Sequence, residues 1–315
     1  MQPIHPAGIE VLEQVAEVRV AQDPSVAGLL SQIADVEGIL VRTAPLPGEV
    51  IEAALRLRVI ARHGVGVDNI DVAAATRRGI PVAYTPNANA TSVAEHALVL
   101  MGALAKQLLP YDRATRAGQW EVRNSYRAID LGGRTLGVVG LGRIGREVAR
   151  RARAAFDMRV MGYDPYLDEA TVRALGIQPV ATLEELLEAA DVVSVHVPLT
   201  EGTRHLIGAA ELARMKPTAL LINTSRGPVV DQAALVKALR EGRIAGAGLD
   251  VFDPEPPPDS LELFTLDNVV VTPHSAALTT EAVIRMATGA AQAIVDVLSG
   301  RRPEHVVNPE VFEKA

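Results

Sequence analysis

The chain has 315 residues, of which 48% are hydrophobic and 22% charged, and this length and composition favour two domains with filled cores over disorder. Its 31 basic and 38 acidic residues give a formal net charge of −7, with no run of Lys or Arg, so neither nucleic acid nor an anionic membrane is an expected partner. The absence of Cys excludes disulfides, thiolate metal sites and a Cys nucleophile, and it agrees with a reducing cytosol.

The first part of the chain alternates short apolar strands with helices, which is typical of α/β folds with parallel sheets. No basic and apolar signal sequence is recognised at the start, so the expected location is cytoplasmic. The most apolar helix, residues 93–105, contains Glu95 and His96 and is too short to cross a bilayer. Before residue 90 we predict strands at residues 15–20, 38–42, 59–62 and 81–84, and helices at residues 49–56 and 72–77.

A glycine pattern follows the next predicted strand, residues 136–139, and precedes a predicted helix, residues 146–154. Gly140 permits a tight turn, Gly142 lets the backbone approach a pyrophosphate, and Gly145 lets the helix pack on the strand. Backbone N–H groups at the start of that helix then face the phosphate. A glycine-bearing turn without a ligand is the alternative, but the position between strand and helix favours a bound dinucleotide.

Asp164 ends the strand that follows, about 20 residues after Gly145, the spacing of a ribose-binding acid. A carboxylate there accepts hydrogen bonds from ribose hydroxyls and repels a 2′-phosphate. The next residues contain no Arg, so NAD is favoured over NADP. A simple turn residue at the strand end is the alternative.

From residue 136 onward the pattern predicts a complete doubly wound, parallel nucleotide-binding domain. Its strands are residues 136–139, 160–163, 192–197, 219–223, 246–251 and 268–272. Long helices, about residues 91–105 and 280–299, lead into and out of it. We therefore predict a Rossmann domain, residues 96–282, inserted into a flavodoxin-like substrate domain formed by residues 1–95 and 283–315. The crevice between the domains is the expected active site.

Three ionisable residues follow successive strands of this nucleotide-binding domain, where ligands of open α/β sheets bind. His274 is a candidate base for a hydroxyl proton, because imidazole is the side chain that exchanges protons near neutral pH. Glu255 can orient the imidazole, and Arg226 suits a carboxylate through its planar cation. Each has a plainer interpretation: a strand cap for His274, surface charge for Glu255 and a solvated turn for Arg226. The other His residues lack a comparable strand-end position with a carboxylate partner, and no zinc-ligand spacing occurs, so no metal is expected.

The sequence resembles the D-isomer-specific 2-hydroxyacid dehydrogenase family over nearly its whole length. The motifs that carry the resemblance are residues 62–71, 87–95, 140–145, 196–200, 223–227, 248–252 and 272–274. By that resemblance Arg226 orients and polarises the substrate, His274 donates and accepts the proton, and Glu255 pairs with His274, with Asp253 as a competing acid. The backbone of Val65 and Gly66 is expected to bind the substrate carboxylate.

The resemblance also implies a set of cofactor contacts for NAD. They are Arg143 and Ile144 with Gly140, Gly142 and Gly145 at the pyrophosphate, Asp164 at the ribose, Val197 and Pro198 on the adenine side, and Thr224, Asp250 and His274 near the nicotinamide. Arg42 and Arg62 are candidates for a substrate phosphate or, equally, for salt bridges at strand ends.

The expected function is therefore NAD-dependent interconversion of a small D-2-hydroxy acid and its 2-keto acid, of the 3-phosphoglycerate or glycerate, hydroxypyruvate and glyoxylate type. An NAD(H)-sensing protein of the corepressor type on the same fold is the alternative. Glu255 disfavours formate, because the formate-specific members carry Gln there. The family is expected to form homodimers, and the segment 108–130, with Trp120 and Tyr126, is a contact arm or a cover for its own domain.

Overall fold

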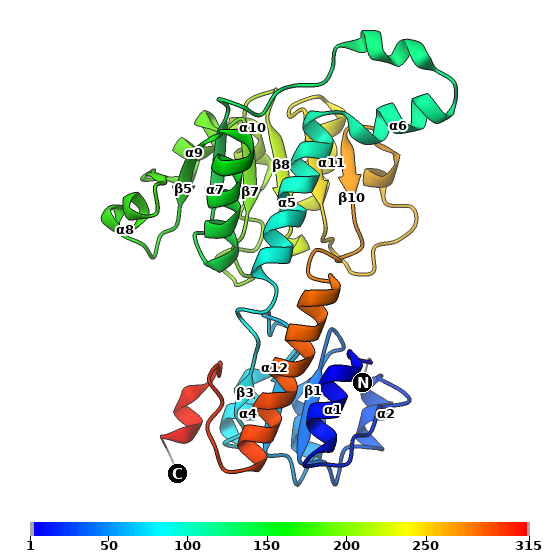
Figure 1. The fold of residues 1–315 in the computed structure, drawn as a ribbon, viewed down its shortest axis with the longest axis vertical. Coiled ribbons are helices and arrows are strands. Elements are labelled where there is room, and N and C mark those ends of the chain that lie inside the picture. Colours follow the sequence, from blue (N-terminus) through cyan, green and yellow to red (C-terminus); the bar gives the residue numbers. More distant parts are fainter. Residues whose placement is uncertain (1–2, 314–315) are drawn as a thin grey trace. The chain divides into compact units, whose positions relative to one another are not determined.

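The computed structural model describes residues 3–313, and the chain divides into two compact units. One unit contains residues 1–89 and 277–315, and the other is the continuous segment 90–276 (Figure 1). The boundaries expected from sequence, 95/96 and 282/283, both lie a few residues later. The first boundary differs because helix α5 (Ala90–Ala105) packs in the core of the second unit from Ala94 to Ala105.

The first unit is built on a parallel sheet with the strand order β1 (Gly38–Val41), β2 (Val59–Arg62) and β3 (Val82–Ala83). Its helices are α1 (Pro6–Glu13), α2 (Val26–Leu30), α3 (Gly48–Ala53), α4 (Val72–Arg77) and α12 (Thr280–Leu298), with a 3₁₀ turn η4 (Pro309–Phe312). Helices α1 and α12 pack closely at Gly8, where a Cβ would lie only 2.8 Å from the Ala287 carbonyl oxygen. Glycine at this position therefore permits the close approach.

The strand predicted at residues 15–20 is wrong. The segment follows α1 as irregular chain, and no backbone hydrogen bond among the described residues joins it to β1. Val18 and Val20 would share one face of a strand, yet Val18 packs on the core while Val20 is 56% exposed. Apolar residues alone therefore suggested a strand that gains neither uniform burial nor a ladder partner.

The second unit holds a seven-stranded parallel sheet in the order β10-β9-β8-β7-β4-β5-β6, which confirms the predicted α/β class. The strands are β4 (Thr135–Val139), β5 (Arg159–Tyr163), β6 (Gln178–Pro179), β7 (Val192–Val195), β8 (Leu220–Asn223), β9 (Gly246–Leu249) and β10 (Val269–Val271). The strand order reverses between β4 and β7, the place where ligands bind in doubly wound sheets. The glycine loop follows β4 and therefore lies at that switch point.

Helices cover both faces of this sheet (Figure 1). They are α5, α6 (Leu108–Arg116), α7 (Arg143–Phe156), α8 (Glu169–Ala174), α9 (Leu183–Ala189), α10 (Ala209–Arg214) and α11 (Gln232–Arg240), with 3₁₀ turns η1 (Trp120–Ser125), η2 (Gly227–Val229) and η3 (Glu262–Thr265). Small residues let the layers approach: a Cβ on Gly137 would lie 2.4 Å from Leu186 of α9, and one on Gly248 would lie 3.0 Å from Leu100 of α5. The central strands β4, β7, β8 and β9 are buried on both faces, as in other parallel sheets.

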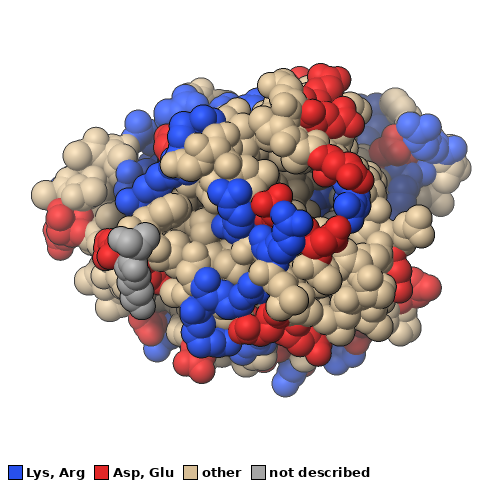
Figure 2. All heavy atoms as spheres, turned by 90° about the horizontal axis from the view of Figure 1, so that it is seen from below, with Lys and Arg blue, Asp and Glu red and all other residues tan. Residues whose placement is uncertain are grey.

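No helix within residues 3–313 is long and apolar enough to cross a membrane. The face drawn in Figure 2 mixes basic with acidic side chains. This face therefore lacks the continuous positive surface that a nucleic acid requires.

His63, at the end of β2, predicts how stability depends on pH. The ring is 4% exposed, and burial, with the charges of Arg42 and Arg62, lowers the pKa of His63 to about 4 from 6.5. Between pH 6.5 and 4, His63 is protonated in the unfolded chain but neutral in the folded chain. The free energy of unfolding therefore decreases as the pH falls through this range, by about 3 kcal/mol in total. His63→Phe should remove this part of the loss, measured by urea unfolding across that pH range.

The control is His205→Asn, at an exposed His, which should leave the pH dependence as it is in the unmodified chain. An unchanged slope in His63→Phe would show that His63 titrates normally in the folded state.

Candidate active site

Two of the three loop glycines are required by the packing of the protein itself. Gly140 has φ +90, and a Cβ there would lie 3.0 Å from the His196 carbonyl oxygen. A Cβ on Gly145 would lie 2.0 Å from the Gly140 carbonyl oxygen. These positions close the turn between β4 and α7 as the sequence predicted.

Gly142 differs, because no atom of the described residues lies within 4 Å of a Cβ built on it. It is the N-cap of α7, and its φ of −70 is open to any residue. The fold therefore gives no reason for glycine at this position, whereas a phosphate approaching the backbone N–H groups of Arg143 and Ile144 does. The loop thus fits a dinucleotide pyrophosphate.

Asp164 links the end of β5 to the glycine loop. Its carboxylate accepts hydrogen bonds from the backbone N–H groups of Leu141 (2.9 Å) and Tyr166 (3.0 Å). Each oxygen accepts one such bond and keeps a lone pair for another donor. The half-buried side chain is therefore held at the place where the sequence puts the ribose acid.

Thr224 provides a second observation in favour of a ligand. The residue follows β8, is 8% exposed, and its hydroxyl has no hydrogen-bond partner in the part of the chain that the structure describes. A buried polar group without a partner is costly, and a cofactor group is a suitable one. Val197 and Pro198 follow β7, the neighbour of β8 in the sheet. A Cβ built on Gly140 would lie 2.8 Å from a Val197 side-chain carbon, so Val197 borders the glycine loop.

Arg226 lies in a turn that Asn223 organises. The buried Asn223 side chain donates to the Arg226 carbonyl oxygen (2.9 Å) and accepts from the Ser225 backbone N–H (3.0 Å). Gly227 follows because a Cβ there would lie 1.9 Å from the Phe252 carbonyl oxygen. The turn therefore packs directly on the chain that leads to Glu255, and the Arg226 guanidinium is near enough to affect the charge of that residue.

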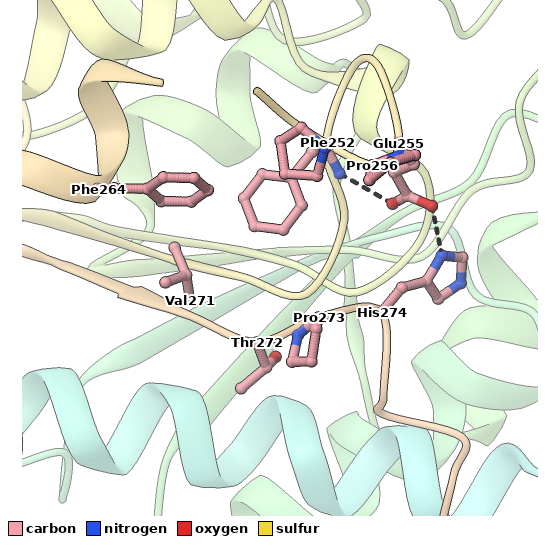
Figure 3. Close-up of a pocket in the computed structure, with 9 residues that line it drawn as sticks. Phe252, Glu255, Pro256, Phe264, Val271, Thr272, Pro273 and His274 are labelled. Carbon is pink, nitrogen blue, oxygen red and sulfur yellow. Dashed lines mark hydrogen bonds and ion pairs between the residues drawn. The ribbon is translucent and has the colours of Figure 1, made fainter. Parts of the chain in front are cut away.

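Glu255 and His274 form the predicted pair. The Glu255 Oε2 atom lies 2.7 Å from the His274 Nδ1 atom, and Oε1 accepts from the Phe252 N–H at 3.0 Å (Figure 3). Burial opposes the ionisation of Glu255, but the hydrogen bonds from His274 and Phe252 and the charge of Arg226 outweigh it, so the pKa of the Glu255 carboxyl lies below its ordinary value. An ionised Glu255 fixes Nδ1 as a donor and leaves His274 Nε2 as the atom free for proton exchange.

His274 occupies the left-handed region of backbone space, at φ 51. A non-glycine residue there costs on the order of 1–3 kcal/mol and persists only when its surroundings enforce it. The backbone N–H of His274 donates to the Asp250 carbonyl oxygen at 2.8 Å. The loop is therefore held from the end of β9.

A cavity of about 350 Å³ opens beside this pair. Figure 3 shows Phe252, Phe264 and Val271 on one side of it and Glu255 with His274 on the other. The side chains of His274 and Glu255, 40% and 35% exposed, form the polar edge of this otherwise apolar cavity.

The candidate substrate-carboxylate residues belong to the other unit. Val65 and Gly66 follow β2 and are half-buried. Arg62 donates from Nε to the Gly66 carbonyl oxygen (2.7 Å) and from Nη1 to that of His63, while Arg42 donates to the Pro3 carbonyl oxygen (2.8 Å). The role of either Arg toward a substrate phosphate stays a prediction.

Two of the other His residues, His196 and His305, have hydrogen-bond partners away from this pair. His196 Nε2 lies 2.8 Å from the Ser194 hydroxyl, and burial lowers the pKa of His196 to about 4. His305 lies 3.2 Å from the Asn87 amide. Within residues 3–313, no cluster of three or more His, Asp or Glu side chains is placed to hold a metal ion.

Residues 98–276 match the family model described as the NAD binding domain of D-isomer specific 2-hydroxyacid dehydrogenases. The chain belongs to this family. It is 45% identical to a D-3-phosphoglycerate dehydrogenase of Methanocaldococcus jannaschii, over 97% of this chain and 58% of that protein. It is also 45% identical to a glyoxylate reductase of Korarchaeum cryptofilum, over 97% of this chain and 94% of that protein.

A crystal structure of the TT0316 protein from Thermus thermophilus aligns with a TM-score of 0.89 at 39% identity, over 96% of this chain and 97% of that one. This family member therefore shares its fold with a solved structure over nearly its full length. In contrast, the chain spans less than two thirds of the phosphoglycerate dehydrogenase that it resembles.

Sequence reasoning missed several residues that shape the site of this family member. Asn223 was recognised only as part of a motif, and its role in the Arg226 turn comes from its side-chain contacts. Thr272 donates its hydroxyl to the Asp250 carboxylate at 2.5 Å, and His96 lies 2.9 Å from the same hydroxyl. No local sequence pattern predicts the contact between His96 and Thr272, because these residues are 176 positions apart.

Proposed function

We propose that the chain catalyses the NAD-dependent interconversion of a small D-2-hydroxy acid and its 2-keto acid, of the 3-phosphoglycerate or glycerate, hydroxypyruvate and glyoxylate type. The Glu255–His274 pair at 2.7 Å carries the proposal. Proton transfer to a keto oxygen requires an acid such as an imidazole that an ionised carboxylate orients. A protein that only binds the cofactor has no need of such a pair. The names of the relatives, a phosphoglycerate dehydrogenase and a glyoxylate reductase, support the same substrate class.

In the proposed reaction each residue has one task. His274 Nε2 gives a proton to the keto oxygen during reduction and takes it back during oxidation, while Glu255 stabilises the imidazolium and keeps Nδ1 as the donor. Arg226 binds the substrate carboxylate and polarises the keto oxygen through its planar, bidentate cation. The backbone N–H groups of Val65 and Gly66, in the first unit, are also proposed to bind the substrate carboxylate.

The nicotinamide, when bound, supplies or takes up the hydride at the substrate carbon. The residues proposed to hold the cofactor are those of the glycine loop with Arg143 and Ile144, Asp164, Val197, Pro198, Thr224 and Asp250. The open space at Gly142 and the unpartnered hydroxyl of Thr224 support this assignment.

A panel of keto acids tests the function: glyoxylate, hydroxypyruvate, pyruvate and 3-phosphohydroxypyruvate, each with NADH and with NADPH. We expect NADH oxidation with at least one of them. Binding of NADH without turnover on any keto acid would favour the corepressor-type alternative.

Asp164 is proposed to select NAD over NADP, and a matched pair of variants tests it. Asp164→Asn removes the charge that repels a 2′-phosphate, so the ratio of kcat/KM with NADH to kcat/KM with NADPH should fall by about tenfold or more, the value of a charge-assisted hydrogen bond. Asp168→Asn removes a charge four residues away and keeps the cap of α8, since Asn caps as well as Asp. An equal ratio in both variants would show that Asp164 does not read the ribose.

The proposed assembly is a homodimer. Within the segment 108–130, Trp120 is 62% exposed and Tyr126 87% exposed, which argues that these rings do not serve to cover their own unit and supports the contact-arm interpretation.

A further inference from the structure

A chain of hydrogen bonds runs from α5 to the loop that carries His274. The His96 Nε2 atom lies 2.9 Å from the Thr272 hydroxyl oxygen, and that hydroxyl donates to Asp250 Oδ1 at 2.5 Å. In Figure 3 the cyan helix α5 runs beside Thr272. Thr272 has a single hydroxyl hydrogen, which is given to Asp250, so His96 Nε2 must be the donor in the first bond.

The Asp250 carboxylate extends this series of hydrogen bonds to the residues that follow His274. It is 1% exposed, and it accepts from the backbone N–H groups of Ser275 (2.8 Å, at Oδ1) and Ala276 (2.9 Å, at Oδ2). The Asp250 carbonyl oxygen accepts from His274 itself. His274 is thus held at its own N–H and at the two residues that follow.

The left-handed backbone of His274 makes such support necessary. A residue at φ 51 relaxes toward ordinary backbone angles unless the flanking groups are fixed. Thr272 precedes His274 by two residues, and the Asp250 carboxylate bonds Thr272 before His274 and Ser275 and Ala276 after it. This carboxylate therefore supports the loop on both sides of His274. His96, half-buried at 21% side-chain exposure, bonds the hydroxyl that orients this carboxylate.

We propose that His96 is a positioning residue for His274: by donating from Nε2 to Thr272, it fixes the Asp250 carboxylate and hence the loop in which His274 meets Glu255. The consequence for catalysis rests on the proposed function, whereas the consequence for the loop does not. The inference therefore has two tests, one that measures the stability of the loop by hydrogen exchange and one that measures turnover.

Amide hydrogen exchange by NMR tests the loop. In His96→Leu the amides of Ser275 and Ala276 should exchange about 3- to 10-fold faster, the change expected for one lost hydrogen bond. In His96→Gln they should exchange at nearly the original rate, because the Gln amide nitrogen donates from about the position of the His Nε2 atom. The amides of strand β9 serve as the internal reference. Unchanged exchange at Ser275 and Ala276, or equal acceleration in β9, would overturn the proposal.

Kinetics of the variants test the effect on His274. We expect His96→Leu to lower kcat several-fold with little change in the KM for NADH, and His96→Gln to restore it. With Thr272→Val the double variant should be no slower than the slower single variant, since both act through one chain. The proposal would be contradicted if the losses of kcat in the two single variants added up in the double variant, or if His96→Leu had the same kcat as the unmodified chain. Absence of turnover in the unmodified chain would refute the proposed function and leave the exchange experiment to decide on His96.

Discussion

His274→Asn is expected to lower kcat for keto-acid reduction by about 10²- to 10⁴-fold, the usual contribution of a general acid. The variant keeps a residue that tolerates the left-handed backbone, since Asn is enriched at positive φ, so the loop at φ 51 should persist. Its amide accepts no proton at pH 7, and the Glu255 carboxylate loses the imidazolium that it stabilises. NADH affinity, measured by fluorescence titration, should change little because the glycine loop is intact.

A matched control exists elsewhere in the same unit. His205 also has a positive φ, 53, and its side chain is exposed. His205→Asn therefore makes the same chemical replacement in the same backbone conformation and should retain nearly full turnover. Full kcat in both variants would remove His274 from the proton pathway, and an equal loss in both would point to damage from the replacement itself.

The fold was predictable where burial imposes a pattern on the sequence. The strands β4, β7 and β8 are buried along their length, so each appears as a run of apolar residues followed by a turn. β6 contains only Gln178–Pro179, too short for any periodicity, and it was missed. The valines of residues 15–20 gave the opposite error, because an apolar run predicts burial but not the presence of a neighbouring strand.

The charged groups of the site were predictable for a topological reason. Arg226, Glu255 and His274 each follow a strand, and the carboxyl ends of parallel strands meet at one edge of a sheet. The contact of Glu255 with His274 follows from that rule. The groups that hold them were not predictable, because His96 belongs to a helix far away in the sequence and hydrogen bonds between distant side chains leave no periodic signal.

Arg226→Gln is expected to lower kcat/KM for the keto acid by about 10²- to 10³-fold, the cost of removing one donor aimed at the developing charge. Arg226→Lys should give an intermediate value, because an ammonium keeps the charge but cannot form two parallel bonds to a carboxylate. The Arg226 Nη1 atom donates to the Ser225 carbonyl oxygen at 2.8 Å. The turn should persist in both variants, because Asn223 and Gly227 also hold its backbone.

The comparison variant for Arg226 is Arg204→Lys, at a residue 55% exposed at its side chain and 4.0 Å from Asp253. Steady-state kinetics over a range of keto-acid concentrations should show full kcat/KM for Arg204→Lys, while both Arg226 variants keep the KM for NADH. A loss confined to the KM for NADH would place Arg226 at the cofactor instead. Retained kcat/KM in Arg226→Gln would show that another group binds the carboxylate, and the Arg62 guanidinium, which already bonds the loop of Gly66, would be the next residue to replace.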